Sequence, residues 1–250
     1  MWWIVIIVLL VILFAVAVIL LCRPMKIPRE PDREGAEDEE AFRAYDRTSR
    51  SPIFAVERYI IFNGLDKTRP EGRLVDVGCG PGYLAARISR KYPELKVTGL
   101  DISEVTLTIA KRNWPSDEYD NLEFLVADAQ QLPFSDSSVD FIVSSLSLHH
   151  WQDARKALSE IYRVLMPGGR FLIFDLRRDA PAYFYYALKI GQALLSPRAL
   201  RRTNGAVGSF WAAYTPSEIK TIFDNIPIEN LRIEPHFGWM LIRGSKSEKP

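Results

Sequence analysis

The stretch LVDVGCGPGYLA, residues 74–85, decides the fold of this chain. Its first residues are apolar and predict a short strand, whereas the apolar side chains of YLAARIS, which begins at its end, have helical spacing. Between them, Gly78, Gly80 and Gly82 permit positive φ angles and let a ligand approach the backbone closely. A strand that turns through glycines into a helix is typical of the first βα unit of a nucleotide-binding sheet.

The spacing of these glycines separates two classes of cofactor-binding turn. Dinucleotide enzymes favour G-x-G-x-x-G, in which the last glycine lets the helix pack on the strand. Here the turn is G-x-G-x-G, with Pro81 inside it and the acidic Asp76 two residues before the first glycine. The pattern therefore disfavours a nicotinamide-dependent oxidoreductase, which is kept as an alternative.

From about residue 41 onward, predicted strands alternate with predicted helices. The strands are expected at 73–78, 96–103, 122–128, 139–148 and 170–177. Helices are expected at 41–65 with a break near Ser51-Pro52, at 83–93, from the end of the second strand to about residue 113, at 154–165 and at 215–225. Such alternation predicts right-handed βαβ units in an α/β fold, with a mostly parallel sheet covered on both faces.

Two aspartates follow predicted strands, where parallel sheets bind their ligands. Asp101 ends the second strand, and its carboxylate can accept hydrogen bonds from both hydroxyls of a ribose. Asp128 ends the third strand, where it can accept from an adenine amino group while the Ala129 amide donates to a ring nitrogen. Taken alone, an aspartate at a strand end is more often a helix cap, a role open to Asp101 or Ser103, so the ribose interpretation depends on the neighbouring glycine turn.

Four segments in order resemble one enzyme family. They are DVGCGPG (76–82), LD (100–101), AD with LPF (127–128 and 132–134) and LMPGG (165–169). They look like the motifs of class I S-adenosylmethionine-dependent methyltransferases with a methyltransferase type 11 domain, similar to the ubiquinone/menaquinone biosynthesis enzymes, over about residues 40–245. The resemblance implies S-adenosyl-L-methionine as cofactor. It also implies a Rossmann-like, doubly wound, seven-stranded, mostly parallel sheet that ends in an antiparallel hairpin at 230–244.

The resemblance also assigns residues to the cofactor. Asp76 and the loop of Gly78, Gly80 and Gly82 would hold the methionine end, Asp101 the ribose, Ile102 the adenine face, Asp128 and Ala129 the adenine edge, and Ser145 and Leu146 the methionyl part.

His149 and His150 follow the fourth predicted strand and are the candidates for a catalytic base. Histidine titrates near neutral pH and could take a proton from a phenol, amine or thiol acceptor. A purely structural role, packing under Trp151, is the other interpretation, because many relatives transfer methyl groups without a base. No cysteine spacing in the chain predicts a metal site.

Residues 2–21, WWIVIIVLLVILFAVAVILL, carry no charged or polar side chain. A helix of this length spans a hydrocarbon core of roughly 30 Å, which favours a transmembrane anchor over a buried helix or a cleaved signal peptide. Basic residues directly after it predict a cytosolic C-terminal side. The sequence thus predicts a single-pass membrane protein with an anchor at 1–22, a charged, proline-containing linker at 23–40 and a cytosolic methyltransferase domain at 41–250.

The methyl acceptor is the least predictable part. Residues 179–214 are rich in aromatic side chains and contain Arg198, Arg201 and Arg202, so they predict either core packing or an apolar cap that rests on a bilayer and admits a lipid-like or quinone-like acceptor. A net charge of +1 gives no sign of a nucleic-acid partner. The function predicted is a membrane-anchored methyltransferase of a small acceptor, with an inactive membrane scaffold as the alternative; the oligomeric state is not predicted.

Overall fold

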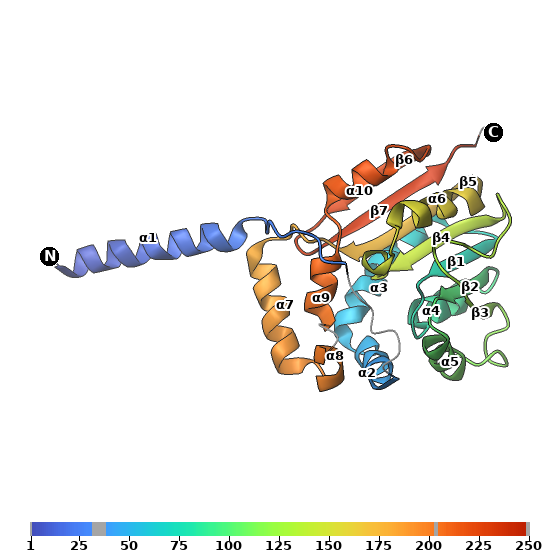
Figure 1. The fold of residues 1–250 in the computed structure, drawn as a ribbon, viewed down its shortest axis with the longest axis horizontal. Helices are drawn as coiled ribbons and strands as arrows, with labels where there is room; N and C mark the ends of the chain where they lie inside the picture. Colours follow the sequence, from blue (N-terminus) through green and yellow to red (C-terminus); the bar gives the residue numbers. More distant parts are fainter. Residues whose placement is uncertain (1, 32–38, 203–204, 249–250) are drawn as a thin grey trace.

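A seven-stranded sheet forms the centre of the molecule (Figure 1). The computed structural model describes residues 2–31, 39–202 and 205–248. The strands are β1 (Arg73–Val77), β2 (Lys96–Asp101), β3 (Leu122–Val126), β4 (Val139–Ser145), β5 (Leu165–Leu176), β6 (Ile228–Pro235) and β7 (Trp239–Lys246). Their order across the sheet is β3-β2-β1-β4-β5-β7-β6.

The first five strands are parallel, and the C-terminal hairpin supplies the antiparallel edge. β1 pairs with β2 and β4, β2 with β3, and β4 with β5, all in parallel register. β7 lies antiparallel between β5 and β6. The predicted mostly parallel, seven-stranded sheet with an antiparallel last strand is therefore confirmed. The chain order reverses between β1 and β4, so ligands are expected at the carboxyl ends of these strands.

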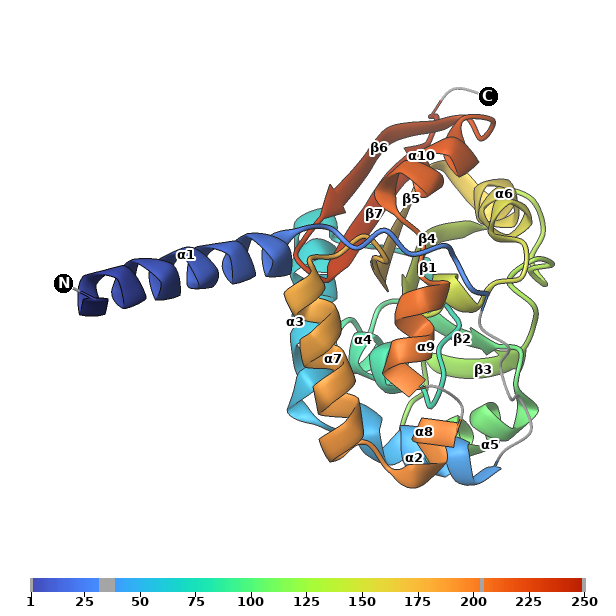
Figure 2. The ribbon, with the colours of Figure 1, turned by 60° about the vertical axis from the view of Figure 1, so that its left-hand side comes forward.

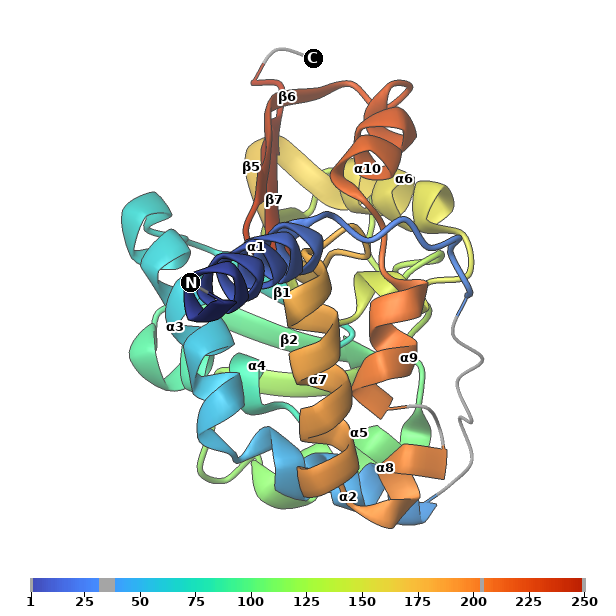
Figure 3. The ribbon, with the colours of Figure 1, turned by 90° about the vertical axis from the view of Figure 1, so that its left-hand side faces the viewer.

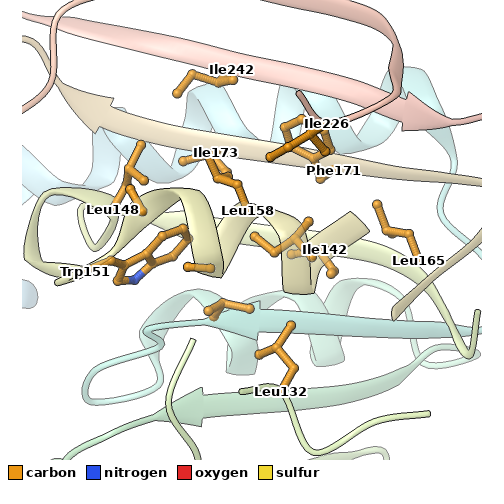
Figure 4. Packing of buried hydrophobic residues seen from close by; sticks show 14 of the residues in the cluster. Leu132, Ile142, Leu148, Trp151, Leu158, Leu165, Phe171, Ile173, Ile226 and Ile242 are labelled. Carbon is orange, nitrogen blue, oxygen red and sulfur yellow. The ribbon is translucent and has the colours of Figure 1, made fainter. Parts of the chain in front are cut away.

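Helices cover both faces of the sheet, and each face has its own apolar core. Their bounds are α2 (Glu39–Ser49), α3 (Pro52–Thr68), α4 (Tyr83–Lys91), α5 (Glu104–Asn113), α6 (Ala154–Val164), α7 (Ala182–Leu195), α8 (Arg198–Arg202), α9 (Gly205–Ala212) and α10 (Pro216–Phe223). Side chains of α6 and α10 pack on one face, where Figure 4 shows Leu158 of α6 and Trp151 among the buried apolar side chains. Side chains of α3, α4 and α5 pack on the other face.

Several predicted boundaries shift in the structure. The predicted break near Ser51-Pro52 is confirmed, because Ser51 is the extended N-cap of α3 and Pro52 occupies its first turn, where no amide donor is needed. The fourth strand ends at Ser145, since Leu146 adopts a positive φ of 51° and the chain then forms a short 3-10 helix, Leu148–His150. The fifth strand starts five residues before the predicted residue 170, at Leu165.

Both the backbone conformation and the room available for a side chain require glycine at position 82. Gly82 caps α4 with a φ of 80°, a left-handed conformation that disfavours any residue with a Cβ. A Cβ at this position would lie 2.6 Å from Cζ of Phe124 on β3. The turn therefore needs glycine here for packing as well as for ligand approach.

Gly82→Ala is expected to lower the free energy of unfolding by roughly 2 kcal/mol or more, because left-handed strain alone costs about 1–2 kcal/mol and the overlap with Phe124 adds to it. Urea denaturation of the full chain in mild detergent measures the change. Gly191→Ala is the matched control, since Gly191 lies inside α7 and a Cβ added there would meet no other atom within 4 Å. The control should raise stability by about 0.5–1 kcal/mol; equal effects at both positions would contradict the argument.

Residues 2–21 form a helix, α1 (Trp2–Cys22), that projects away from the rest of the molecule (Figures 1 and 2). Large apolar side chains such as Leu13 and Phe14 are exposed along it. Within the described part of the chain, no helix meets the length and apolarity required of a membrane-spanning segment. The predicted helix is thus present, whereas its assignment as a transmembrane anchor is not confirmed.

The first part of the charged, proline-containing linker predicted over 23–40 lies against the domain. Arg178, a buried residue, donates from Nε to the carbonyl of Ile27 at 2.7 Å. The N–H of Met25 donates to the carbonyl of Ala180 at 3.0 Å, and that of Glu30 donates to the carbonyl of Trp211 at 3.1 Å, so this segment is held by the residues before α7 and by α9. The remaining linker residues at 32–38 lie outside the described residues.

Candidate functional site

A cleft opens at the carboxyl ends of β1 and β4, the position expected from the sheet topology. Most of its wall comes from the glycine turn, the end of β4 and the helices α2 and α3. The lining residues are Tyr45, Ser49, Phe54, Glu57, Arg58, Asp76, Gly78, Cys79, Gly80, Pro81, Tyr83, Leu84, Ser145 and Leu146. The structure thus brings together Asp76, Gly78, Gly80, Ser145 and Leu146 of the predicted cofactor residues.

Asp101 holds the glycine turn from the end of β2. Its carboxylate accepts a hydrogen bond from the backbone N–H of Gly80 at 2.9 Å and from that of Ser103 at 3.0 Å. The N–H groups of Gly78 and Cys79 both donate to the carbonyl of Leu100 at 2.8 Å. The turn is therefore fixed to β2 beside Asp101, which places this carboxylate next to the cleft.

The carboxylate of Asp76 is buried in the wall of the cleft, and few protein groups offset the cost of burying its charge. Its side chain is 1% exposed, and its Oδ2 atom has no hydrogen-bond partner among the described residues. Burial, together with the negative charges of Glu57 and Asp101, raises the pKa of Asp76 to about 8. A cationic group in the cleft would supply the missing partner and favour the ionised carboxylate.

Helix α3 contributes two charged residues that the sequence did not single out. Glu57 is buried and accepts a hydrogen bond from the hydroxyl of Ser145, and its burial raises the pKa of its carboxyl group. Arg58 is buried too; it donates to the carbonyl of Ser49 at 3.1 Å, while its Nε atom finds no hydrogen-bond partner within the described part of the chain. The cleft therefore presents carboxylates and one guanidinium side by side.

Comparisons with known proteins agree with this geometry. The sequence model of the "Methyltransferase domain" family matches residues 75–173, the span from β1 through most of β5. The chain belongs to the class I S-adenosylmethionine-dependent methyltransferases. The predicted family and its cofactor are thereby confirmed, and the oxidoreductase alternative is dropped.

The chain spans about half the length of the first curated relatives that it matches. The ubiquinone/menaquinone biosynthesis C-methyltransferase of Geotalea daltonii is 30% identical over 155 residues, 58% of this chain and 66% of the relative. An O-methyltransferase of Aspergillus nomiae is 39% identical over 109 residues, 43% of this chain and 48% of the relative. A solved S-adenosylmethionine-dependent methyltransferase from Aquifex aeolicus shares the fold, with a TM-score of 0.60, 21% identity and coverage of 83% of this chain and 97% of that structure.

The cleft residues fit the methionine end of S-adenosylmethionine. That end is a zwitterion, with an ammonium and a carboxylate on one carbon. Asp76 has a buried carboxylate oxygen, and Arg58 a buried guanidinium nitrogen, for which the described residues supply no hydrogen-bond partner. One buried group of each sign suits a ligand that carries both charges.

The residues assigned to the adenine lie on the other side of Asp101. Ile102 is 58% exposed at the end of β2, so its side chain is open to contact with a flat ligand. The carboxylate of Asp128 accepts from the backbone N–H of Gln130 at 2.8 Å, which fixes the turn after β3. Ala129 packs against the apolar core, which fixes the backbone of the same turn.

His149 is paired with a carboxylate that the sequence patterns did not single out. Its Nδ1 atom lies 2.7 Å from Oδ1 of Asp175 near the end of β5, and both side chains are almost fully buried. The His149 backbone N–H donates to Oδ2 of the same carboxylate at 2.9 Å. The ring of His150 lies beside that of His149, with 3.9 Å between the centroids. Asp175 therefore orients one ring nitrogen of His149, and neither histidine is among the residues that line the cleft.

The docked segment after α1 reaches this region too. Arg29 donates from Nη2 to the carbonyl of His149 at 3.2 Å and from Nε to that of Ala212 at 2.7 Å. Its guanidinium lies over the ring of Tyr214, 4.0 Å from the centroid. The predicted linker therefore helps to hold the loop that carries His149.

Proposed function

We propose that this protein is a membrane-associated methyltransferase that transfers a methyl group from S-adenosylmethionine to a small lipid-like or quinone-like acceptor. The observation that carries the proposal is the cleft at the carboxyl ends of β1 and β4, with Asp76 and the Asp101-bound glycine turn in its wall. When bound, S-adenosylmethionine supplies an electrophilic methyl group on a sulfonium.

In this proposal the chain's own residues bind and orient the two reactants. Asp76 and Glu57 hold the ammonium of the methionine end, and Arg58 holds its carboxylate. Asp101 accepts from the ribose hydroxyls, while Ile102, Asp128 and Ala129 contact the adenine. His149, oriented by Asp175, accepts the proton that the acceptor loses as its new bond to the methyl carbon forms and the sulfonium bond breaks.

The acceptor class is inferred from the relatives and from α1. The relatives named above are a quinone-biosynthesis C-methyltransferase and an O-methyltransferase. At 1.5 Å per residue, the 21 residues of α1 extend about 31 Å, close to the thickness of a hydrocarbon core. Membrane association through α1, with the domain on the cytosolic side as the flanking basic residues predict, would bring the cleft near lipid-soluble acceptors.

The test is to titrate the full chain, in detergent, with S-adenosylmethionine and with NADH by calorimetry, and then to incubate it with methyl-labelled cofactor and lipid extracts. Saturable binding of S-adenosylmethionine alone, followed by label in the organic phase, supports the proposal. A folded protein that binds no S-adenosylmethionine would contradict it and leave an inactive scaffold as the explanation.

The raised pKa of Asp76 predicts a pH-dependent affinity. Below pH 8 the carboxyl group of the free protein is mostly protonated, and pairing with an ammonium requires that it lose this proton. Affinity for S-adenosylmethionine should therefore rise as pH increases, roughly tenfold per pH unit between pH 6 and 7.5, where the ligand's α-amino group is still mostly protonated. Calorimetry in buffers of different ionisation enthalpy would detect the released proton.

Asp76→Asn is the matched variant for this prediction, because it keeps the shape of the side chain and removes its titration. Its affinity should be lower at pH 7.5 and nearly independent of pH. If the wild-type affinity is flat between pH 6 and 7.5, Asp76 is not the group that binds the ammonium.

A further inference from the structure

Helix α7 presents an apolar face to the outside of the domain. Tyr183, Tyr186, Ile190 and Leu194 recur every three or four residues and so lie on one face of the helix, here called the outer face of α7. They are between 41% and 77% exposed. Surface helices usually expose polar side chains, so an exposed stripe of this kind indicates a partner.

The opposite face of α7 already has its partner. Tyr185 and Phe184 pack on Phe210 of α9, with 5.4 Å and 6.2 Å between ring centroids. The helix is therefore anchored to the domain by its inner face. Rotation of α7 to bury the outer face would break these aromatic contacts.

The position of α1 indicates what covers the outer face. The N–H of Ala182, at the start of α7, donates to the carbonyl of Arg23, directly after α1, at 3.0 Å. From this junction α1 leaves the domain, and α7 runs across its direction (Figures 1 and 3). A bilayer that takes up α1 would have its surface parallel to α7.

Charge supports a lipid surface over a protein partner. The sequence of α7, AYFYYALKIGQALL, has no acidic residue. Arg198 and Arg201 on α8 lie just beyond its C-terminal end, and Arg201 is exposed. An apolar face bordered by basic side chains is typical of helices that lie in the interface of an anionic membrane.

We propose that α7 is an interfacial membrane helix whose outer face inserts into the headgroup region of an anionic bilayer. The proposal rests on the membrane association of α1 and is independent of the methyl-transfer chemistry. It places the domain against the bilayer instead of free in solution at the end of α1. Helix α2, which lines the cleft with Tyr45 and Ser49, contacts α8, the short helix that follows α7, so the cleft would lie near the side of the domain that faces the lipid.

The experiment uses the full chain in vesicles of phosphatidylcholine and phosphatidylglycerol. A Cys22→Ser background removes the exposed cysteine, whereas Cys79 is buried and can stay. An environment-sensitive dye is attached at Leu194→Cys and, as a control, at Asp117→Cys, in the loop before β3 and therefore at the amino end of the parallel strands. We expect brominated lipids to quench the dye at position 194 and not at position 117.

A second variant tests the apolar contact itself. Ile190→Asp in the Leu194→Cys background should lower the ratio of docked to undocked domain by roughly tenfold or more, because a buried apolar side chain is lost. Its affinity for S-adenosylmethionine should stay unchanged, which shows that the domain is folded and separates this result from the test of the cofactor. The proposal is overturned if vesicles do not capture the protein, if captured protein leaves position 194 as accessible to water as position 117, or if phosphatidylglycerol does not strengthen docking.

Discussion

Asp101→Ala is expected to weaken the binding of S-adenosylmethionine by a hundredfold or more. The substitution removes the acceptor of the Gly80 and Ser103 N–H groups and, in the proposed complex, the acceptor of two ribose hydroxyls. Hydrogen bonds to a charged group are worth about 1.5–3 kcal/mol each, and every 1.4 kcal/mol corresponds to a tenfold change in affinity. Calorimetric titration at pH 7.5 measures the loss.

Two controls separate the loss of ligand contacts from a loss of structure. Asp117→Ala removes an exposed carboxylate at the other end of the sheet and should leave the affinity unchanged. Asp101→Asn keeps one oxygen as an acceptor for the glycine turn, so it should bind more weakly than wild type and more tightly than the alanine variant. A folded Asp101→Ala variant whose affinity falls less than tenfold would remove Asp101 from the cofactor site.

The residues around Asp101 were predictable because local sequence determines their positions. A strand, a glycine turn and a helix follow one another within 74–85, and Asp101 ends the adjacent parallel strand. Parallel strands bring their carboxyl ends to one edge of the sheet, so the two segments meet for topological reasons alone. Periodicity and turn residues were therefore enough to predict the five parallel strands and the edge of the sheet where the cleft lies, whereas the antiparallel hairpin was predicted from the family resemblance.

Glu57 and Arg58 could not be predicted in the same way. Which side chains of α3 face the cleft depends on how this helix rotates and packs on β5, and that depends on contacts far along the chain. The same holds for residues 23–31, whose charged and proline-containing composition indicates a linker. Arg178, about 150 residues later, donates to the backbone of this segment, and no local pattern contains that information.

The pairing of His149 with Asp175 lies between these cases. Asp175 comes near the end of β5, which pairs in parallel with β4, and His149 follows the end of β4. The rule that predicted Asp101 and Asp128 would have found Asp175 if it had been applied to the fifth strand. The contact was thus available from the sequence and was missed.

His149→Ala is expected to lower kcat by roughly a hundredfold or more while the affinity for S-adenosylmethionine stays close to that of wild type. A positioned base contributes about 10²–10⁴-fold to catalysis when the acceptor must lose a proton. The histidine lies outside the residues that line the cofactor cleft, so its removal should affect transfer and not cofactor binding. Initial rates with the labelled cofactor and the acceptor found in lipid extracts measure the effect.

Asp175→Asn distinguishes a base from a structural pair. The asparagine can still accept the backbone N–H of His149, so the loop keeps that contact, but it no longer offers a charged partner to Nδ1. If His149 is the base, the variant has a lower kcat. In addition, the pH at which kcat falls on acidification, because the imidazole becomes protonated, differs from that of the wild type. If the pair only fixes the ends of β4 and β5, both variants lower the free energy of unfolding and leave the pH dependence of kcat as it is. Because these outcomes differ in the pH profile, the measurement decides whether acceptors that must lose a proton are substrates of this cleft.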